Sequence, residues 1–201
     1  MPQVSLTEFV AAARQGDRLL SFPTDTVPAL AVRPDRAELI FAAKQRNQTK
    51  PLILMGATPV DLWPYVRGFE PQWQQIADRY WPGAVTLVLP ASKLLPAAIN
   101  PTDPTSVGLR VPDHAIARHI LAQTGVLATT SVNRSGEPAL LNFDEINAQF
   151  PNVLTLQPAE IAGLEQTGLQ NRPASGLPST VAQWTAAGWK VLRQGSIEFA
   201  E

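Results

Sequence analysis

Short apolar runs with strand character alternate with segments of helical periodicity along the whole chain. Strands are expected at residues 18–22, 51–55, 84–90, 106–111, 126–131, 153–156, 179–184 and 189–195. Helices are expected at residues 5–15, 35–45, 61–66, 71–80, 113–123 and 143–149. This interleaving predicts an α/β fold with a twisted mixed sheet and flanking helices. The last two strands have a short connection, so we expect them to pair antiparallel.

The chain has 201 residues, no internal repeat and no convincing linker, which predicts a single domain over residues 1–201. Residues 157–178 carry several glycines and prolines and are predicted to be a loop. A mobile flap and an ordinary surface loop are both open interpretations of that segment.

Composition excludes several classes of site. The chain has no cysteine, which excludes disulfides, thiolate nucleophiles and cysteine-based metal centres. The two histidines, His114 and His119, are five residues apart and fall on different helical faces, so we expect no metal site and no catalytic histidine. The net charge of −1 argues against non-specific nucleic-acid binding. Without a signal sequence or an apolar run of ~20 residues, the predicted location is the cytoplasm, with no membrane partner.

The usual phosphate-binding signatures are missing, because the chain has neither a glycine-rich GxGxxG turn nor a P-loop. Polar and cationic groups instead follow the predicted strands, where ligands of open α/β sheets usually bind. The first such loop is PTDT at residues 23–26, whose Thr24 and Thr26 hydroxyls can bind a small polar ligand. The alternative is that Asp25 simply caps a turn.

A cationic cluster follows, formed by Lys44, Arg46 and Lys50 at the end of a predicted helix. Cations at a helix C-terminus favour the macrodipole without any ligand. Three cations within seven residues nevertheless favour a function, since they can compensate a triphosphate without a P-loop.

Two more predicted strands end in polar groups. Arg110 ends the strand SVGLR, and a turn containing Thr130, Ser131 and Asn133 can form an anion nest, although such a turn more often holds no ligand. Near the C-terminus, Ser179 and Arg193 repeat the pattern of a hydroxyl and a cation at the ends of apolar strands.

Taken together, these stretches resemble the YrdC-type threonylcarbamoyl-AMP synthase family over residues 18–196. The order and spacing of the motifs carry the resemblance. They are PTDT, Lys44-Gln45-Arg46 with the following KPL, PGAVT at residues 82–86, VGLRVPDH at residues 107–114, SVNRSG at residues 131–136, PSTV at residues 178–181 and RQG at residues 193–195.

The resemblance implies a single-domain enzyme with a large concave cleft that makes threonylcarbamoyl-adenylate and pyrophosphate from ATP, L-threonine and bicarbonate, for tRNA modification. It implies Mg²⁺ bound with ATP, and tRNA or a tRNA-modifying transferase complex as partner. Lys44 and Arg46 would be catalytic. The resemblance further implies ATP binding by Lys44, Arg46, Arg110, Ser131, Asn133, Ser179 and Arg193, and threonine binding by Thr24, Thr26, Lys50 and Thr130.

The sequence departs from the family pattern after PTDT. An aromatic residue and Gly-Leu-Gly are usual there, whereas this chain has Val27-Pro28-Ala29-Leu30-Ala31, which adds methyl groups near a ligand. Two alternatives therefore stay open: a non-catalytic paralogue that binds nucleotide or RNA, and carbamoyl-adenylate formation as in a related domain of hydrogenase maturation proteins.

Overall fold

A computed structural model describes residues 2–45, 47, 49–169 and 173–200. Within these residues the α-helices are α1 (Leu6–Gln15), α2 (Glu38–Lys44), α3 (Pro59–Leu62), α4 (Pro71–Tyr80), α5 (Ala115–Thr124), α6 (Phe143–Gln149) and α7 (Pro158–Gln166). The strands are β1 (Gln3–Val4), β2 (Leu20–Phe22), β3 (Ala29–Val32), β4 (Ile53–Met55), β5 (Val85–Pro90), β6 (Ser106–Arg110), β7 (Leu127–Ser131), β8 (Leu154–Leu156), β9 (Thr180–Thr185) and β10 (Gly188–Arg193).

The strands form a mixed sheet in the order β1-β8-β2-β3-β7-β4-β6-β5-β9-β10. Strand β4 pairs parallel with β6 and antiparallel with β7, while β5 pairs antiparallel with β6 and parallel with β9. Strands β9 and β10 form an antiparallel hairpin, as predicted from their short connection. The predicted mixed α/β class is confirmed.

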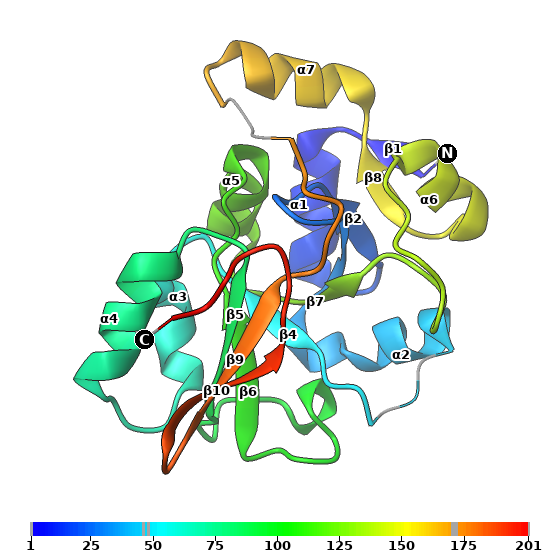
Figure 1. Cartoon of the computed structure of the whole chain (residues 1–201). Helices are drawn as coiled ribbons and strands as arrows, with labels where there is room; N and C mark the ends of the chain where they lie inside the picture. Colours follow the sequence, from blue (N-terminus) through cyan, green and yellow to red (C-terminus); the bar gives the residue numbers. More distant parts are fainter. Residues whose placement is uncertain (1, 46, 48, 170–172, 201) are drawn as a thin grey trace.

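Opposite faces of the sheet pack against different helices. On the first face, buried side chains such as Leu54, Leu87 and Leu109 join a core with α2, α3 and α4. On the second face, Phe22 and Ala31 pack with α1 and α5. Figure 1 shows α1 and α5 side by side, with α7 above them at the top of the view. These helices cover only part of the second face, which leaves room for a cavity.

Capping residues at both ends define α1 as predicted. The Ser5 hydroxyl accepts a hydrogen bond from the Glu8 backbone N–H, and the Glu8 carboxylate accepts one from the Ser5 N–H, forming a capping box. Gly16 ends the helix with φ of 76°, a conformation that glycine adopts without steric strain.

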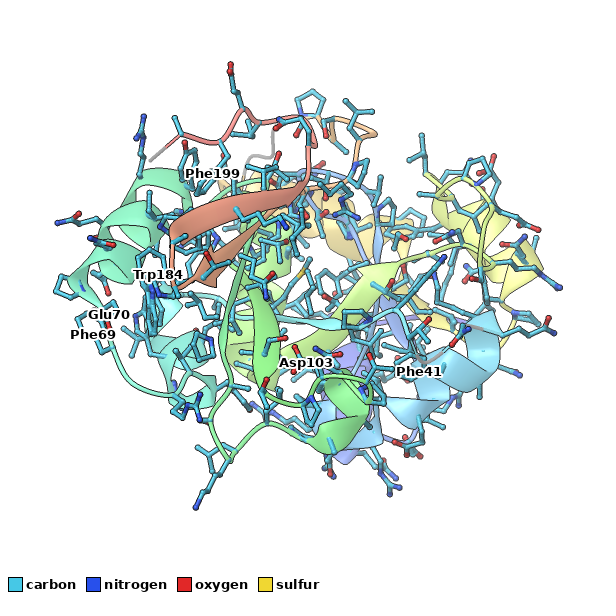
Figure 2. All side chains as sticks on the ribbon, turned by 60° about the horizontal axis from the view of Figure 1, so that its bottom comes forward. Phe41, Phe69, Glu70, Asp103, Trp184 and Phe199 are labelled. Atoms are coloured by element: carbon cyan, nitrogen blue, oxygen red, sulfur yellow. The ribbon has the colours of Figure 1, made fainter. Side chains whose placement is uncertain are left out.

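A chain of aromatic contacts fixes the β9–β10 hairpin beside α4. Ring centroids lie 6.2 Å apart for Trp73 and Trp184, 5.4 Å for Trp184 and Trp189, and 5.7 Å for Trp189 and Phe199. Figure 2 shows Trp184 beside α4 and Phe199 above it. Since β10 ends at Arg193, this packing also positions a side chain of the site described below.

The structure corrects the sequence predictions at three elements. Residues 157–178 are not a continuous loop, because α7 forms within them, starting with Pro158 at its first turn. Gly163 weakened the helix signal in the sequence, but a single glycine costs only about 1 kcal/mol relative to alanine and does not prevent the helix. Strands β1 and β3 were also missed. Strand β1 has only two residues and forms by pairing with β8. The four residues of β3 are too few and too alanine-rich to give a strand signal, and pairing with β2 and β7 stabilises this strand.

Candidate functional site

A cavity of about 730 Å³ opens on the second face of the sheet, beyond the area that α1 and α5 cover. Alternate residues of β4, β5, β6 and β9 line its floor, for example Thr86 and Val88 of β5, and Gly108 and Arg110 of β6. This alternation follows from the strand geometry, in which every second side chain points to the same face.

The cavity does not lie at one edge of the sheet, which corrects the expectation that the polar loops meet beyond the carboxyl ends of the strands. Strands β6 and β7 run in opposite directions, because β4 pairs parallel with one and antiparallel with the other. Arg110 and Ser131 therefore end their strands at opposite edges. They line the same cavity because it extends across the face between them.

Gly108 keeps the cavity floor open at the centre of β6. It pairs with Ile53 of β4 and Val88 of β5, and all three line the cavity. A Cβ atom at Gly108 would come within 2.9 Å of the Ile53 Cγ2 atom and 3.4 Å of the Thr86 Cγ2 atom. Any larger residue at this position would reduce the space in the cavity above β6.

Arg110 is a buried cation of the cavity, with 2% of its surface exposed. Its Nη2 forms an ion pair with Asp25 Oδ1 at 2.6 Å, Nη1 donates to Thr26 Oγ1 at 2.9 Å, and Nε donates to the Gly83 carbonyl at 3.0 Å. Burial lowers the pKa of Arg110, and the nearby Arg193 adds to this, while Asp25 opposes it. The PTDT turn thus orients the guanidinium, because the side chains of Asp25 and Thr26 both accept hydrogen bonds from it.

Arg193 brings a second guanidinium to the same cavity from the end of β10. It donates to the Ser179 carbonyl at 2.8 Å and to Ser179 Oγ at 3.2 Å, and that hydroxyl lies 2.9 Å from Thr86 Oγ1. Burial lowers the pKa of Arg193. Arg110 and Arg193 repel one another, which favours an anionic ligand in the cavity that both line.

Lys44, Ser131 and Asn133 form a third polar group. Lys44 is 1% exposed, and its Nζ donates to the Ser131 carbonyl and, at 2.9 Å, to Asn133 Oδ1. The Ser131 hydroxyl donates to the same Asn133 oxygen at 2.7 Å. Among these three, only Ser131 is a described lining residue of the cavity, so Lys44 lies directly behind its wall. Arg46, predicted to act with Lys44, lies outside the described residues.

Of the four residues predicted to bind threonine, three line the cavity and one does not. Thr26, Lys50 and Thr130 line the cavity, whereas Thr24 lies behind Thr26, with 3.0 Å between the two hydroxyl oxygens. Thr24 Oγ1 donates to the Val27 carbonyl at 2.7 Å, so it shapes the turn.

Several lining residues were missed by sequence reasoning. Thr86 and Gly108 stand inside the quoted PGAVT and VGLR motifs, so the motifs contained a signal for them. Asp103 and Gln183 also line the cavity, but nothing in their local sequence marks them. Figure 2 shows Asp103 on the same side of the molecule as Phe41 of α2.

His114 has a structural role at the start of α5. Its Nδ1 accepts the Ala117 N–H at 3.3 Å, and the side chain is 6% exposed. Burial lowers the pKa of His114 to about 4, with Asp113 opposing the shift. The ring is therefore neutral near pH 7 and acts as a helix cap, in keeping with its predicted position near the helix start.

This burial predicts a pH-dependent stability. The folded pKa lies below the ordinary value of 6.5, so the unfolded chain binds more protons between pH 6.5 and 4. The free energy of unfolding should therefore fall as the pH drops through this range, by on the order of 2 kcal/mol from pH 7.5 to pH 5. Denaturant titrations at both pH values measure it. His114→Asn, which keeps an N-cap acceptor, should lose most of the fall, and His119→Asn should retain it; an equal fall in all three proteins contradicts the prediction.

The described part of the chain holds no group of three or more histidine, cysteine, aspartate or glutamate side chains placed to bind a metal ion. None of its helices is both long and apolar enough to cross a membrane.

Residues 12–195 match the family model Sua5_yciO_yrdC, whose description is "Telomere recombination". A threonylcarbamoyl-AMP synthase of Chromohalobacter salexigens is 32% identical over 162 residues, which cover 79% of this chain and 86% of that protein. A threonylcarbamoyl-AMP synthase of Rattus norvegicus is 31% identical over 198 residues, covering 95% of this chain and 67% of that protein.

Solved structures agree with the fold. The P. abyssi Sua5 complex with L-threonine is 27% identical, with a TM-score of 0.78 over 96% of this chain; the match spans 55% of that longer chain. E. coli YciO has the same TM-score of 0.78 at 20% identity, over 96% of this chain and 90% of its own. The second likeness concerns the fold alone.

Proposed function

Because this chain belongs to the Sua5/YciO/YrdC family, we propose that it is a threonylcarbamoyl-AMP synthase, which forms threonylcarbamoyl-adenylate and pyrophosphate from L-threonine, bicarbonate and ATP for tRNA modification. The observation that carries the proposal is the meeting of Arg110, Arg193, Ser131, Ser179 and Lys50 in one cavity, although they are far apart in the sequence. Such a cavity suits a polyanion and a small polar molecule together.

The proposed reaction requires that the reactants be positioned and that the charge on the phosphates be stabilised. The lining residues of the cavity can supply both effects. The threonine amine bonds to the carbon of bicarbonate with loss of water, giving a carbamate. A carbamate oxygen then attacks the α-phosphorus of ATP, and the bond from that phosphorus to the leaving pyrophosphate breaks. Charge develops on the phosphate oxygens during this step, and the guanidinium groups of Arg110, which is buried, and Arg193 can stabilise it.

Lys44 and Arg46 are proposed to bind the phosphates, and Thr26, Lys50 and Thr130 to line the threonine side. Lys44 is proposed to exchange a hydrogen bond to Ser131 or Asn133 for one to a phosphate when ATP binds. Thr24 would act through Thr26, whose hydroxyl lies next to it.

Magnesium is proposed to enter with ATP. The described lining residues include Asp103, whose carboxylate accepts hydrogen bonds from Thr105 and Ser106, but no carboxylate cluster that would hold the ion alone. The phosphates of ATP would supply most of the ligands, and the ion would neutralise their charge. The product would pass to a tRNA-modifying transferase in the cytoplasm.

A non-catalytic nucleotide- or RNA-binding protein is the second proposal. Pro28 and Ala29, which replace an aromatic residue and a glycine of the family pattern, both line the cavity. They therefore lie where they can change substrate choice.

A substrate panel separates the proposals. The protein is incubated with Mg²⁺-ATP and bicarbonate plus threonine, serine or no amino acid, and with ATP plus carbamoyl phosphate. We expect an AMP adduct of the threonylcarbamoyl mass only with threonine, detected by mass spectrometry together with pyrophosphate. Nucleotide binding without any adduct would favour the non-catalytic protein, and an adduct from carbamoyl phosphate would favour carbamoyl-adenylate formation.

A further inference from the structure

A second cavity, of about 530 Å³, lies between the 23–28 turn, the starts of α5 and α6, and α7. Its volume is within the range of roughly 300–1,000 Å³ that small-molecule sites occupy. Most of its wall is apolar and includes Pro23, Ile116, Phe143, Ile161 and Pro173.

His114 places a hydrogen-bond donor in this wall. Its Nδ1 accepts the Ala117 N–H, so the proton of the neutral ring is on Nε2. Within the described part of the chain, Nε2 donates to no protein atom, and it is not fully buried although the side chain is only 6% exposed. Because His114 lines the second cavity, this donor is accessible from the cavity, where a carbonyl oxygen of a ligand can accept its hydrogen bond.

The charge of the second cavity differs from that of the first. Its described lining residues include no lysine or arginine, and the carboxylate of Glu165 on α7 gives it a negative rim. A phosphate or carboxylate would meet this charge without a compensating cation, which disfavours anions.

We propose that this second cavity binds a small uncharged or cationic molecule with an aliphatic or aromatic body and a carbonyl oxygen, which accepts a hydrogen bond from His114. The proposal does not depend on the function proposed for the first cavity. The bound molecule would lie against Pro28, which lines both cavities. It would also lie beside residues 173–176. The N–H groups of Ser175 and Gly176 in this segment donate hydrogen bonds to the carbonyls of Asp25 and Thr26.

Three probes with the same isobutyl body test the proposal by two-dimensional NMR of the whole chain: N-acetyl-leucine amide, which is neutral, leucine amide, which is cationic, and N-acetyl-leucine, which is anionic. We expect saturable shifts at Ile116, Phe143 and Ile161 with the first two probes. The anionic probe should bind at least about tenfold more weakly.

A charge reversal at the rim gives a matched test. Glu165→Lys should weaken leucine amide about tenfold and strengthen N-acetyl-leucine, because it exchanges the sign of the rim. Gln166→Lys, on the next residue of the same exposed helix, adds a positive charge away from the cavity and should leave the order of the probes unchanged.

Two results would overturn the proposal. One is the absence of saturable shifts at the second cavity with all three probes. The other is a probe preference that Glu165→Lys leaves unchanged. Melting curves of both variants show whether α7 is intact, and since both positions are exposed we expect both variants to fold.

Discussion

Replacing Lys44 by alanine is expected to lower threonine- and bicarbonate-dependent pyrophosphate release by roughly 10²–10³-fold, the effect of losing a charge-stabilising contact in the transition state. Lys44 is buried behind the cavity wall and bonds to Ser131 and Asn133, so alanine removes the cation and also two hydrogen bonds. Arg46→Ala is expected to have a similar effect. Release is measured by a coupled phosphate assay with and without threonine.

Lys44→Met separates catalysis from packing, because methionine keeps an unbranched stem but has no charge. We expect it to be as inactive as Lys44→Ala while melting closer to the parent protein. Lys93→Ala removes an exposed lysine and serves as the control that should keep full activity. Turnover at the parent rate in both Lys44→Ala and Arg46→Ala would reject the assigned function of this cluster.

Filling the cavity floor is the second change with a large expected effect. Gly108→Val should lower adenylate formation by roughly 10²-fold, since displacing bound reactants by about an ångström has such an effect on rate. The added Cβ alone comes within 2.9 Å of Ile53 Cγ2, so the valine must displace Ile53 or enter the cavity. Calorimetric titration with ATP and the pyrophosphate assay measure the loss.

Overpacking also lowers stability, typically by about 1–3 kcal/mol, so the variant needs controls. Combining Gly108→Val with Ile53→Ala relieves the clash and should restore stability more than activity. Gly163→Val places the same side chain on α7, where a Cβ meets no atom within 4 Å, and should be active. If Gly108→Val binds ATP as the parent does, the cavity floor is not part of the nucleotide site.

Local sequence signals predicted most helices and strands, because such signals involve residues that are close together in the chain. The capping box of Ser5 and Glu8 defines the start of α1, and Asn142 caps α6 at the predicted boundary. The elements that were missed depend on distant partners. Strand β3 exists because β2 and β7 pair with it on both sides. Helix α7 contains a glycine but has distant partners such as Leu6, whose N–H donates to the Glu160 carboxylate.

The site residues were predicted from the sequence, but their arrangement in space was not. Motif order was enough to select Arg110, Ser131, Ser179 and Arg193, all of which line the first cavity. The inference that they meet beyond the carboxyl ends of the strands was wrong, because strand direction is a property of the assembled sheet. Their shared cavity lies across one face instead.

The sequence alone determined that this is an α/β protein with the Sua5/YciO/YrdC motifs. Helix caps, apolar periodicity and motif order depend on residues that are close together in the chain, so they can be recognised without the structure. Only the tertiary structure decided that Arg110 is held by Asp25, that Lys44 lies behind Ser131 and that a second cavity opens beside His114. Each of these depends on chain segments far apart in sequence, and hydrogen bonds and burial act between them only after the sheet has brought them together.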